Sequence, residues 1–232
     1  MQTSTKRGTP FEAHPDRGAV ATVSHGHTNI SVSGSDVEPA QSLADRGQLY
    51  FSAKRFLARP EIGDVFSWGT NGLSCRPPQS DAARLNLYRC LPQPEACHRL
   101  EVLLTEAIAQ PATPTGIRQA VAASIGAFPS GAKADPIYKS NLVDLLTEEA
   151  HIAGWYQLAV IGGLIRIVRN STFLPAIPEV FEAIDAAREE IWSARVFAEK
   201  AQEVFQELED RLIWAGLLTF DFDYDAGWET LP

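Results

Sequence analysis

The sequence predicts a mainly α-helical fold, with a disordered N-terminus, a small helical bundle and one long C-terminal helix that carries a heptad pattern. Three observations support this prediction. Residues 178–216 contain an unbroken stripe of apolar residues at alternating spacings of four and three, the repeat of a helix that packs along its whole length. From about residue 96 onward, apolar residues recur at helical spacing. Residues 1–45 are rich in Ser, Thr, Gly, His and Asp without a hydrophobic period, a composition typical of disorder.

The long helix is expected to begin at Pro178 and to end at Gly216, since proline suits the first turn of a helix and glycine the position beyond its end. Between residues 179 and 210 it has ten Asp or Glu against three Lys or Arg, which makes its outer face acidic. At about 57 Å it would be longer than any helix before it. Two arrangements stay open: an overhang that pairs with another chain, or a seam packed within the bundle. The inward stripe consists of Val180, Ile184, Ala187, Ile191, Ala194, Ala198, Ala201, Phe205, Leu208, Leu212 and Ala215.

Residues 96–177 are expected to form a helical bundle. The apolar spacing predicts helices over 96–110, 115–127, 136–149 and 151–168. Asp135 is a favourable N-cap for the third of them, and Pro136 suits its first position. The fourth is apolar on most sides, which places it in the middle of the bundle. Its Gly162-Gly163 pair weakens the helix and is expected to permit a close helix crossing.

Two further segments flank these helices. Residues 46–95 combine a basic amphipathic stretch with turn residues around Asn71-Gly72, so a short helix and a hairpin are both open. Residues 217–232 form an acidic-aromatic tail with four acidic residues and no basic one. Such a tail either docks its aromatic side chains into a partner's pocket with a basic rim, or folds back on its own bundle.

The distribution of charge restricts the classes of partner. The formal net charge is −9, but residues 1–90 carry ten Lys or Arg against eight Asp or Glu, whereas residues 91–232 carry ten against 21. An acidic body disfavours non-specific nucleic-acid binding, which needs clustered cations to release phosphate counterions. A DNA-binding regulator would need Lys54, Arg55 and Arg59 to face DNA. Direct nucleic-acid binding is therefore not the expected function.

Cysteine usage and hydropathy predict a cytoplasmic protein. Cys75, Cys90 and Cys97 are an odd number and include no CxxC pair, which disfavours a disulfide framework. The N-terminal residues lack the apolar stretch of a signal peptide. The most apolar run, residues 152–168, contains Arg166 and is shorter than the roughly 20 apolar residues that a membrane span needs. No association with a membrane is expected.

No catalytic, cofactor or metal site is predicted. The sequence has no nucleophile-elbow, zinc-protease or nucleotide-binding motif, and His98 and His151 have no catalytic partner at motif spacing. Residues 221–232 superficially resemble a calcium loop, but the glycine falls too late and the twelfth position is not glutamate. Cys90 and Cys97 are too far apart for a typical zinc-binding pair. We therefore predict a protein that is not an enzyme and binds no cofactor.

An ordered set of features runs from about residue 103 to 184. A short helix ends near Phe128-Pro129, and a D-P-x-x-Y-like helix start follows at residues 135–138, with the Tyr one place early. A Leu-rich helix, a helix with basic residues at its end and an F-L-P-x-I-x-E-[IV] turn at residues 173–180 complete the order. This order resembles small helical replication proteins of phages and prophages, the helicase loaders and replisome organisers. The resemblance implies binding to a replicative helicase or another replisome component, without enzymatic activity.

The chain departs from that family in its long N-terminal region, and it lacks the ATPase motif of AAA+ loaders. The sequence therefore predicts a non-enzymatic accessory factor of phage-type DNA replication that binds a protein partner such as a helicase. The alternative is a self-associating coiled-coil scaffold, a homo-oligomer unrelated to DNA. The expected partner-binding residues are Ile184, Ile191, Ala198, Phe205, Leu208, Leu212, Phe222, Tyr224 and Trp228.

Overall fold

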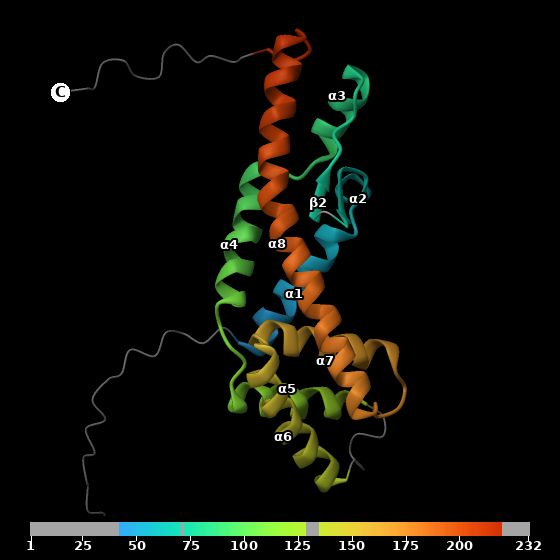
Figure 1. The fold of residues 1–232 in the computed structure, drawn as a ribbon, viewed down its shortest axis with the longest axis vertical. Helices are drawn as coiled ribbons and strands as arrows, with labels where there is room; N and C mark the ends of the chain where they lie inside the picture. Colours follow the sequence, from blue (N-terminus) through green and yellow to red (C-terminus); the bar gives the residue numbers. More distant parts are fainter. Residues whose placement is uncertain (1–41, 71, 129–134, 220–232) are drawn as a thin grey trace, which may run out of the picture. The chain divides into compact units, whose positions relative to one another are not determined.

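The computed structural model describes residues 42–70, 72–128 and 135–219 of the chain. Within these ranges the protein consists of eight helices and one two-stranded hairpin, shown in Figure 1. The mainly α-helical fold and the long C-terminal helix are thereby confirmed. The elements in chain order are α1 (Leu43–Leu57), α2 (Pro60–Val65), β1 (Phe66–Gly69), β2 (Gly72–Cys75), α3 (Asp81–Cys90), α4 (Pro94–Ile108), α5 (Pro114–Ala127), α6 (Pro136–Ala153), α7 (Gln157–Asn170) and α8 (Ile177–Trp214).

Helix α8 begins and ends close to the predicted residues. At its start the backbone N–H of Ala176 donates to the carboxylate of Glu179 over 3.0 Å, and Pro178 occupies the first turn. At its end Gly216 adopts a left-handed φ of 69°, a conformation that glycine adopts at little cost. The N–H of Gly216 donates to the carbonyl of Ile213 over 2.9 Å, which satisfies one of the last carbonyls of the helix.

Ten of the eleven predicted stripe residues of α8 are buried by the chain's own helices, and Ala215 is exposed. Helices α7 and α1 cover the N-terminal half of α8, while α4 and α3 cover its C-terminal half. In this structure the chain's own helices therefore cover the stripe. This corrects the alternative in which α8 extends beyond the bundle and pairs with another chain. Each earlier helix is too short to cover α8 alone, but α7 and α4 lie against successive stretches of it and cover it together.

The crossing of α7 and α8 is close because α7 has glycine where the two helices meet. A Cβ built on Gly163 would lie 2.6 Å from the Cα of Ile184, and one built on Gly162 would lie 3.1 Å from the Cβ of Ala187. Real Cβ atoms do not approach other heavy atoms as closely as 2.6 Å, so only glycine fits at residue 163 in this geometry. The expected role of the glycine pair is confirmed.

The break between α6 and α7 lies later than predicted. Asp135 caps α6 as expected, with its carboxylate accepting from the N–H of Ile137 over 2.8 Å. The helix continues to Ala153 and ends at Gly154, which has a φ of 65°, so the predicted break at residues 149–151 is wrong. The sequence predicted Trp155 to lie in a helix because its neighbours are apolar. It lies instead in the connection between α6 and α7, and its indole nitrogen donates to Asp185 over 2.9 Å.

Residues 46–95 contain both of the structures that the sequence left open. Helices α1, α2 and α3 flank a hairpin in which Phe66 pairs with Cys75 and Gly69 with Gly72. The hairpin packs on α8, since the ring of Phe66 stacks on that of Phe197 with centroids 5.4 Å apart. The segment is therefore part of the core, and it contains helices together with a hairpin where the sequence left a short helix or a hairpin open.

Most of the two terminal segments for which the sequence made predictions lies outside the described residues. Residues 1–41, the larger part of the expected disordered tail, lie outside the described residues, as do residues 220–232 of the acidic-aromatic tail. The boundary at residue 45 is corrected, because Ser42 is the N-cap of α1. Its hydroxyl accepts from the N–H of Asp45 over 3.2 Å, and the Asp45 carboxylate accepts from the N–H of Ser42 over 3.1 Å, forming a capping box. Among the described helices, none combines the length and hydropathy that a bilayer crossing requires.

Candidate partner-binding grooves

Helix α1 is held in place by a polar network on its inner face. The buried Tyr50 hydroxyl donates to Glu190 of α8 over 2.7 Å, and Arg166 of α7 donates to the other oxygen of the same carboxylate over 2.6 Å. The ammonium group of Lys54 lies 3.6 Å from Glu190 as well. Burial, followed by the hydrogen bond to Glu190, raises the pKa of Tyr50 well above its ordinary value, so the hydroxyl remains a donor at neutral pH. The network joins α1, α7 and α8, and it fixes the position from which α1 presents its outer flanks.

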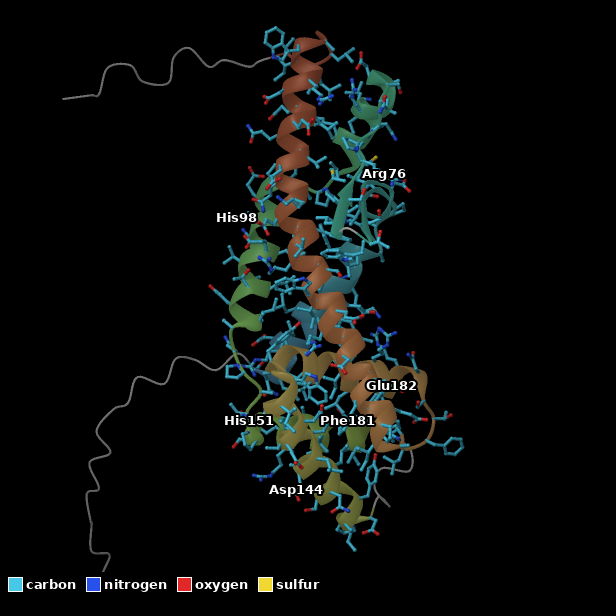
Figure 2. The ribbon with its side chains drawn as sticks, viewed as in Figure 1. Arg76, His98, Asp144, His151, Phe181 and Glu182 are labelled. Carbon is cyan, nitrogen blue, oxygen red and sulfur yellow. The ribbon has the colours of Figure 1, made fainter. Side chains whose placement is uncertain are left out.

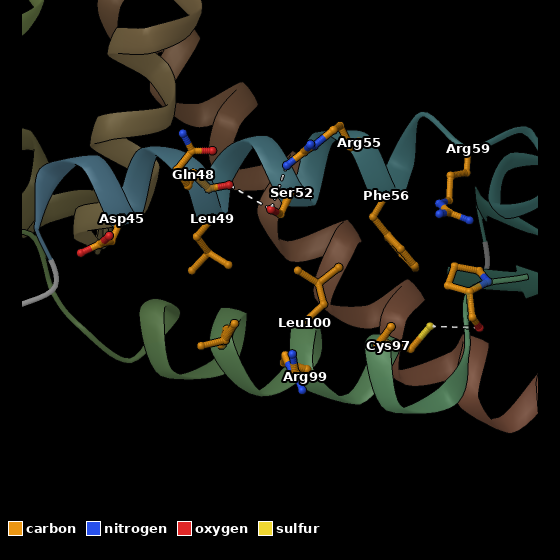
Figure 3. Close-up of a pocket in the computed structure, with 13 residues that line it drawn as sticks. Asp45, Gln48, Leu49, Ser52, Arg55, Phe56, Arg59, Cys97, Arg99 and Leu100 are labelled. Atoms are coloured by element: carbon orange, nitrogen blue, oxygen red, sulfur yellow. Dashed lines mark hydrogen bonds between the residues drawn. The ribbon is translucent and has the colours of Figure 1, made fainter.

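One flank of α1 forms a groove with α4, which we call the α1–α4 groove. Its volume is about 670 Å³. Figure 3 shows Leu49 and Phe56 of α1 extending toward Cys97 and Leu100 of α4, so that the two helices line opposite sides of the groove. Leu49, Phe56 and Cys97 are buried, while Leu100 and Leu103 remain partly exposed. The floor of the groove is therefore apolar, and part of it is open to a ligand.

The Cys97 thiol belongs to this floor and not to a reactive site. It is buried, and its sulfur lies 3.8 Å from the carbonyl oxygen of Pro92, which it meets as a weak donor. Burial raises the pKa of the Cys97 thiol to about 11, although the nearby Arg59 acts in the opposite direction. The thiolate is the nucleophilic form of cysteine, so at neutral pH Cys97 behaves as a small apolar side chain.

The rim of the α1–α4 groove is cationic in a protein whose net charge is −9. Arg55, Arg59 and Arg99 line it, against Asp45 as the acidic residue among the described lining. Arg59 forms an ion pair with Glu61 at 3.1 Å. Arg99 is exposed and pairs with no acidic group in the part of the chain that the structure describes. An apolar floor with this rim is complementary to an apolar ligand that carries negative charge.

The other flank of α1 forms a second groove with α5 and α7, with a volume of about 590 Å³. Its walls are mostly small or aliphatic, and Arg169 stands at one edge with its guanidinium carbon 4.2 Å from the centroid of the Phe51 ring. A third hollow, lined by Phe51, Lys54, Arg55 and Arg169, shares residues with both grooves. Helix α1 is thus flanked on both sides by apolar hollows with cationic edges.

The partner-binding residues predicted from the sequence lie elsewhere. Six of them are buried in the chain's own core and are not available to a partner in this structure, while Phe222, Tyr224 and Trp228 lie outside the described residues. The six buried residues, whose predicted role in partner binding is corrected, are Ile184, Ile191, Ala198, Phe205, Leu208 and Leu212.

The sequence indicated the basic amphipathic stretch of α1 but not the α1–α4 groove. The stretch supplies Leu49, Phe56, Arg55 and Arg59 to the groove. The opposite wall comes from α4, some 40 residues later in the chain, and no local pattern indicates that the two helices pair. The alternation of apolar and basic residues in α1 was the available signal for the groove.

The histidines and cysteines do not converge on one site. His98 lies on α4 and His151 on α6, well separated in Figure 2. His98 has its Nδ1 atom 3.6 Å from a Glu101 carboxylate oxygen on the protein surface. Within residues 42–70, 72–128 and 135–219, no group of three or more His, Cys, Asp or Glu side chains is arranged to hold a metal ion.

The fold and these grooves define a helical protein with a cation-rimmed, apolar surface along α1. No protein-family model matches the chain, and comparisons with curated proteins and with solved structures found no match either.

Proposed function

We propose that the chain is a non-enzymatic, protein-binding accessory factor whose α1–α4 groove receives an acidic, apolar segment of a partner protein. The supporting observation is the local reversal of charge: three arginines surround an apolar floor in a chain with nine more acidic than basic groups. Apolar anchors in such a groove provide most of the affinity of a peptide complex, while complementary charges speed association and select the partner.

The partner that we propose is a replicative helicase or another replisome component, in phage-type DNA replication. This part of the proposal rests on the resemblance of residues 103–184, which span the end of α4, helices α5, α6 and α7, and the start of α8. These elements pack against α1 and form one wall of the second groove, and they contribute Leu103 to the α1–α4 groove. The proposed binding surface thus adjoins the segment that resembles the replication proteins.

Protein recognition is favoured over nucleic-acid recognition by the chemistry of the groove. Surfaces that bind single strands stack bases on exposed aromatic rings, whereas the partly exposed floor here consists of Leu100 and Leu103. The self-associating scaffold has less support, because the stripe that would form its coiled coil is buried within the chain.

The proposal is tested by a binding titration between the intact chain and the purified replicative helicase of its native host. We expect micromolar binding that weakens at least tenfold with Arg99→Glu, because this change places a negative charge on the rim of the groove. Arg118→Glu is the matched control, since Arg118 is exposed on α5 and lines neither groove beside α1. It should change the affinity less than twofold.

Two results would overturn the proposal. One is a complete lack of helicase binding by the folded chain, and the other is an equal loss of affinity in the two arginine variants. A single-stranded oligonucleotide provides the second arm of the test. If it binds more tightly than the helicase and loses affinity with Arg99→Glu, the groove recognises nucleic acid instead of protein.

A further inference from the structure

The chain that follows α8 turns back at the end of the helix. After Gly216, the N–H groups of Leu217 and Leu218 both donate to the carbonyl of Leu212, over 2.9 and 3.3 Å. These bonds resemble the capping pattern in which a left-handed glycine reverses the chain. Leu218 is thereby fixed beside the last turn of α8, and it is the point from which the following residues start.

The residues that follow have the composition that the α1–α4 groove is suited to bind. Residues 220–229 read FDFDYDAGWE, with four aromatic and four acidic residues and no Lys or Arg. Aromatic side chains are effective anchors in apolar pockets, since they bury a large area with few rotatable bonds. The acidic residues match the rim formed by Arg55, Arg59 and Arg99.

The segment is also long enough to reach the groove of its own chain. From Leu218 to Trp228 there are ten residues, which span up to about 33 Å when extended, whereas Phe222 and Tyr224 lie within about 13 and 20 Å of Leu218. The distance along α8 from Leu212 back to Arg195 is about 26 Å. Arg195 marks the level of the groove, because its guanidinium lies 3.9 Å from Glu101, the residue beside Leu100 of the groove floor.

The charge of the surface favours the groove over the outer face of α8. Glu203 and Glu207 of that face form ion pairs with Lys200 and Arg211, but residues 199–211 carry five acidic groups against these two cations. The face is therefore net acidic and disfavours an acidic segment that would follow the helix. The cationic groups nearest to the groove are those of its rim. A tethered segment is present at an effective concentration of about 1 mM, so even weak complementarity leads to occupancy.

We propose that the end of this segment, Trp228 with Glu229, binds in the α1–α4 groove of its own chain and competes there with the acidic segment of a partner, while the residues before it span the distance from Leu218. The inference rests on the proposed function, because it takes the same groove as the partner site. It makes the segment an internal competitor, which a partner with higher affinity displaces.

The test uses the full chain and a fluorescein-labelled peptide of residues 220–232 as the probe. The tail variant carries Trp228→Ser, which removes the anchor that reaches the groove and leaves the described core unchanged. We expect the probe to bind the tail variant with a Kd of about 100 µM and the unaltered chain about tenfold more weakly, as an internal competitor at about 1 mM requires. Adding Arg99→Glu to the tail variant should abolish probe binding, while adding Arg118→Glu should not.

Three results would overturn the inference. The probe binds both proteins equally, or it binds neither, or the weakening in the unaltered chain grows with protein concentration, which would indicate exchange between chains. The helicase titration distinguishes a failure of this inference from a failure of the proposed function. If the helicase binds through Arg99 while the probe binds neither protein, the groove is a partner site without an internal competitor. If the probe competes as expected and the helicase does not bind, the inference stands and the proposed partner is wrong.

Discussion

Gly163 of α7 lies against the backbone of Ile184 on α8, so that a Cβ on residue 163 would be 2.6 Å from the Ile184 Cα. The neighbouring Gly162 packs under Tyr50 of α1, where an added Cβ would be 2.9 Å from the ring. The two glycines thus bring α7, α8 and α1 together at one point. The position of α1, and with it both grooves, depends on this crossing.

We expect Gly163→Ala to destabilise the protein by about 3 kcal/mol, because the clash is with backbone atoms that no side-chain rotation can relieve. Gly126→Ala is the matched control on α5, where an added Cβ meets no atom within 4 Å. It should be neutral or stabilise by up to about 1 kcal/mol through the better helix propensity of alanine. Urea unfolding of both variants measures the difference, and equal stabilities would show that the helices do not cross at this distance.

Glu190→Ala is expected to cost about 2 kcal/mol, because it removes the acceptor of the buried Tyr50 hydroxyl and the partner of Arg166. The adjacent Glu189→Ala changes an exposed carboxylate and should alter the free energy of unfolding by less than about 0.5 kcal/mol. In a double-mutant cycle, Tyr50→Phe should cost less in the Glu190→Ala background than alone. Additive costs would mean that the hydrogen bond does not contribute to stability.

The raised pKa of Cys97 predicts a loss of stability at alkaline pH. Its folded pKa of about 11 exceeds the ordinary value of 9.0, so the folded state holds the proton more tightly than the unfolded state. The stabilisation is complete below pH 9 and is lost as the pH rises through about 11. We expect the difference in unfolding free energy between the unaltered chain and Cys97→Ala to shrink by up to about 2 kcal/mol from pH 8 to pH 10.5. A constant difference, measured by urea unfolding under reducing conditions, would contradict the burial of the thiol.

The sequence predicted those parts of the fold that local chemistry determines. Asp135 caps α6 because its carboxylate can accept from the first free N–H groups, and Gly216 ends α8 because glycine tolerates a positive φ. The break at Gly154 carried the same glycine signal, but the apolar run through Trp155 obscured it. Periodicity shows that a face is apolar and does not show which element covers it. This is why the stripe of α8 was identified while its coverage by α7 and α4 was not.

The candidate site was less predictable than the fold. Phe197 and Val204 lie off the regular stripe of α8 and are nevertheless buried, because the hairpin and α3 cover a second side of the helix. The α1–α4 groove likewise depends on a pairing between distant segments, and Arg99 has a role in it only through its place beside α1. Charge counts along the sequence average over such surfaces, so the acidic total concealed the cationic rim.

We conclude that helices of the same chain cover the apolar stripe of α8, which leaves the flanks of α1 for partners. Ile191→Glu tests it most directly, because Ile191 is fully buried in the middle of the stripe. Gln206→Glu is the control, as an exposed residue of the same helix beside Phe205. Circular dichroism melting and light scattering are measured on both variants. We expect Ile191→Glu to lose cooperative unfolding, since a buried unpaired carboxylate costs more than the stability of most domains can absorb, and Gln206→Glu to melt like the unaltered chain. A folded Ile191→Glu variant that differs only by dissociating from an oligomer into monomers would contradict the claim.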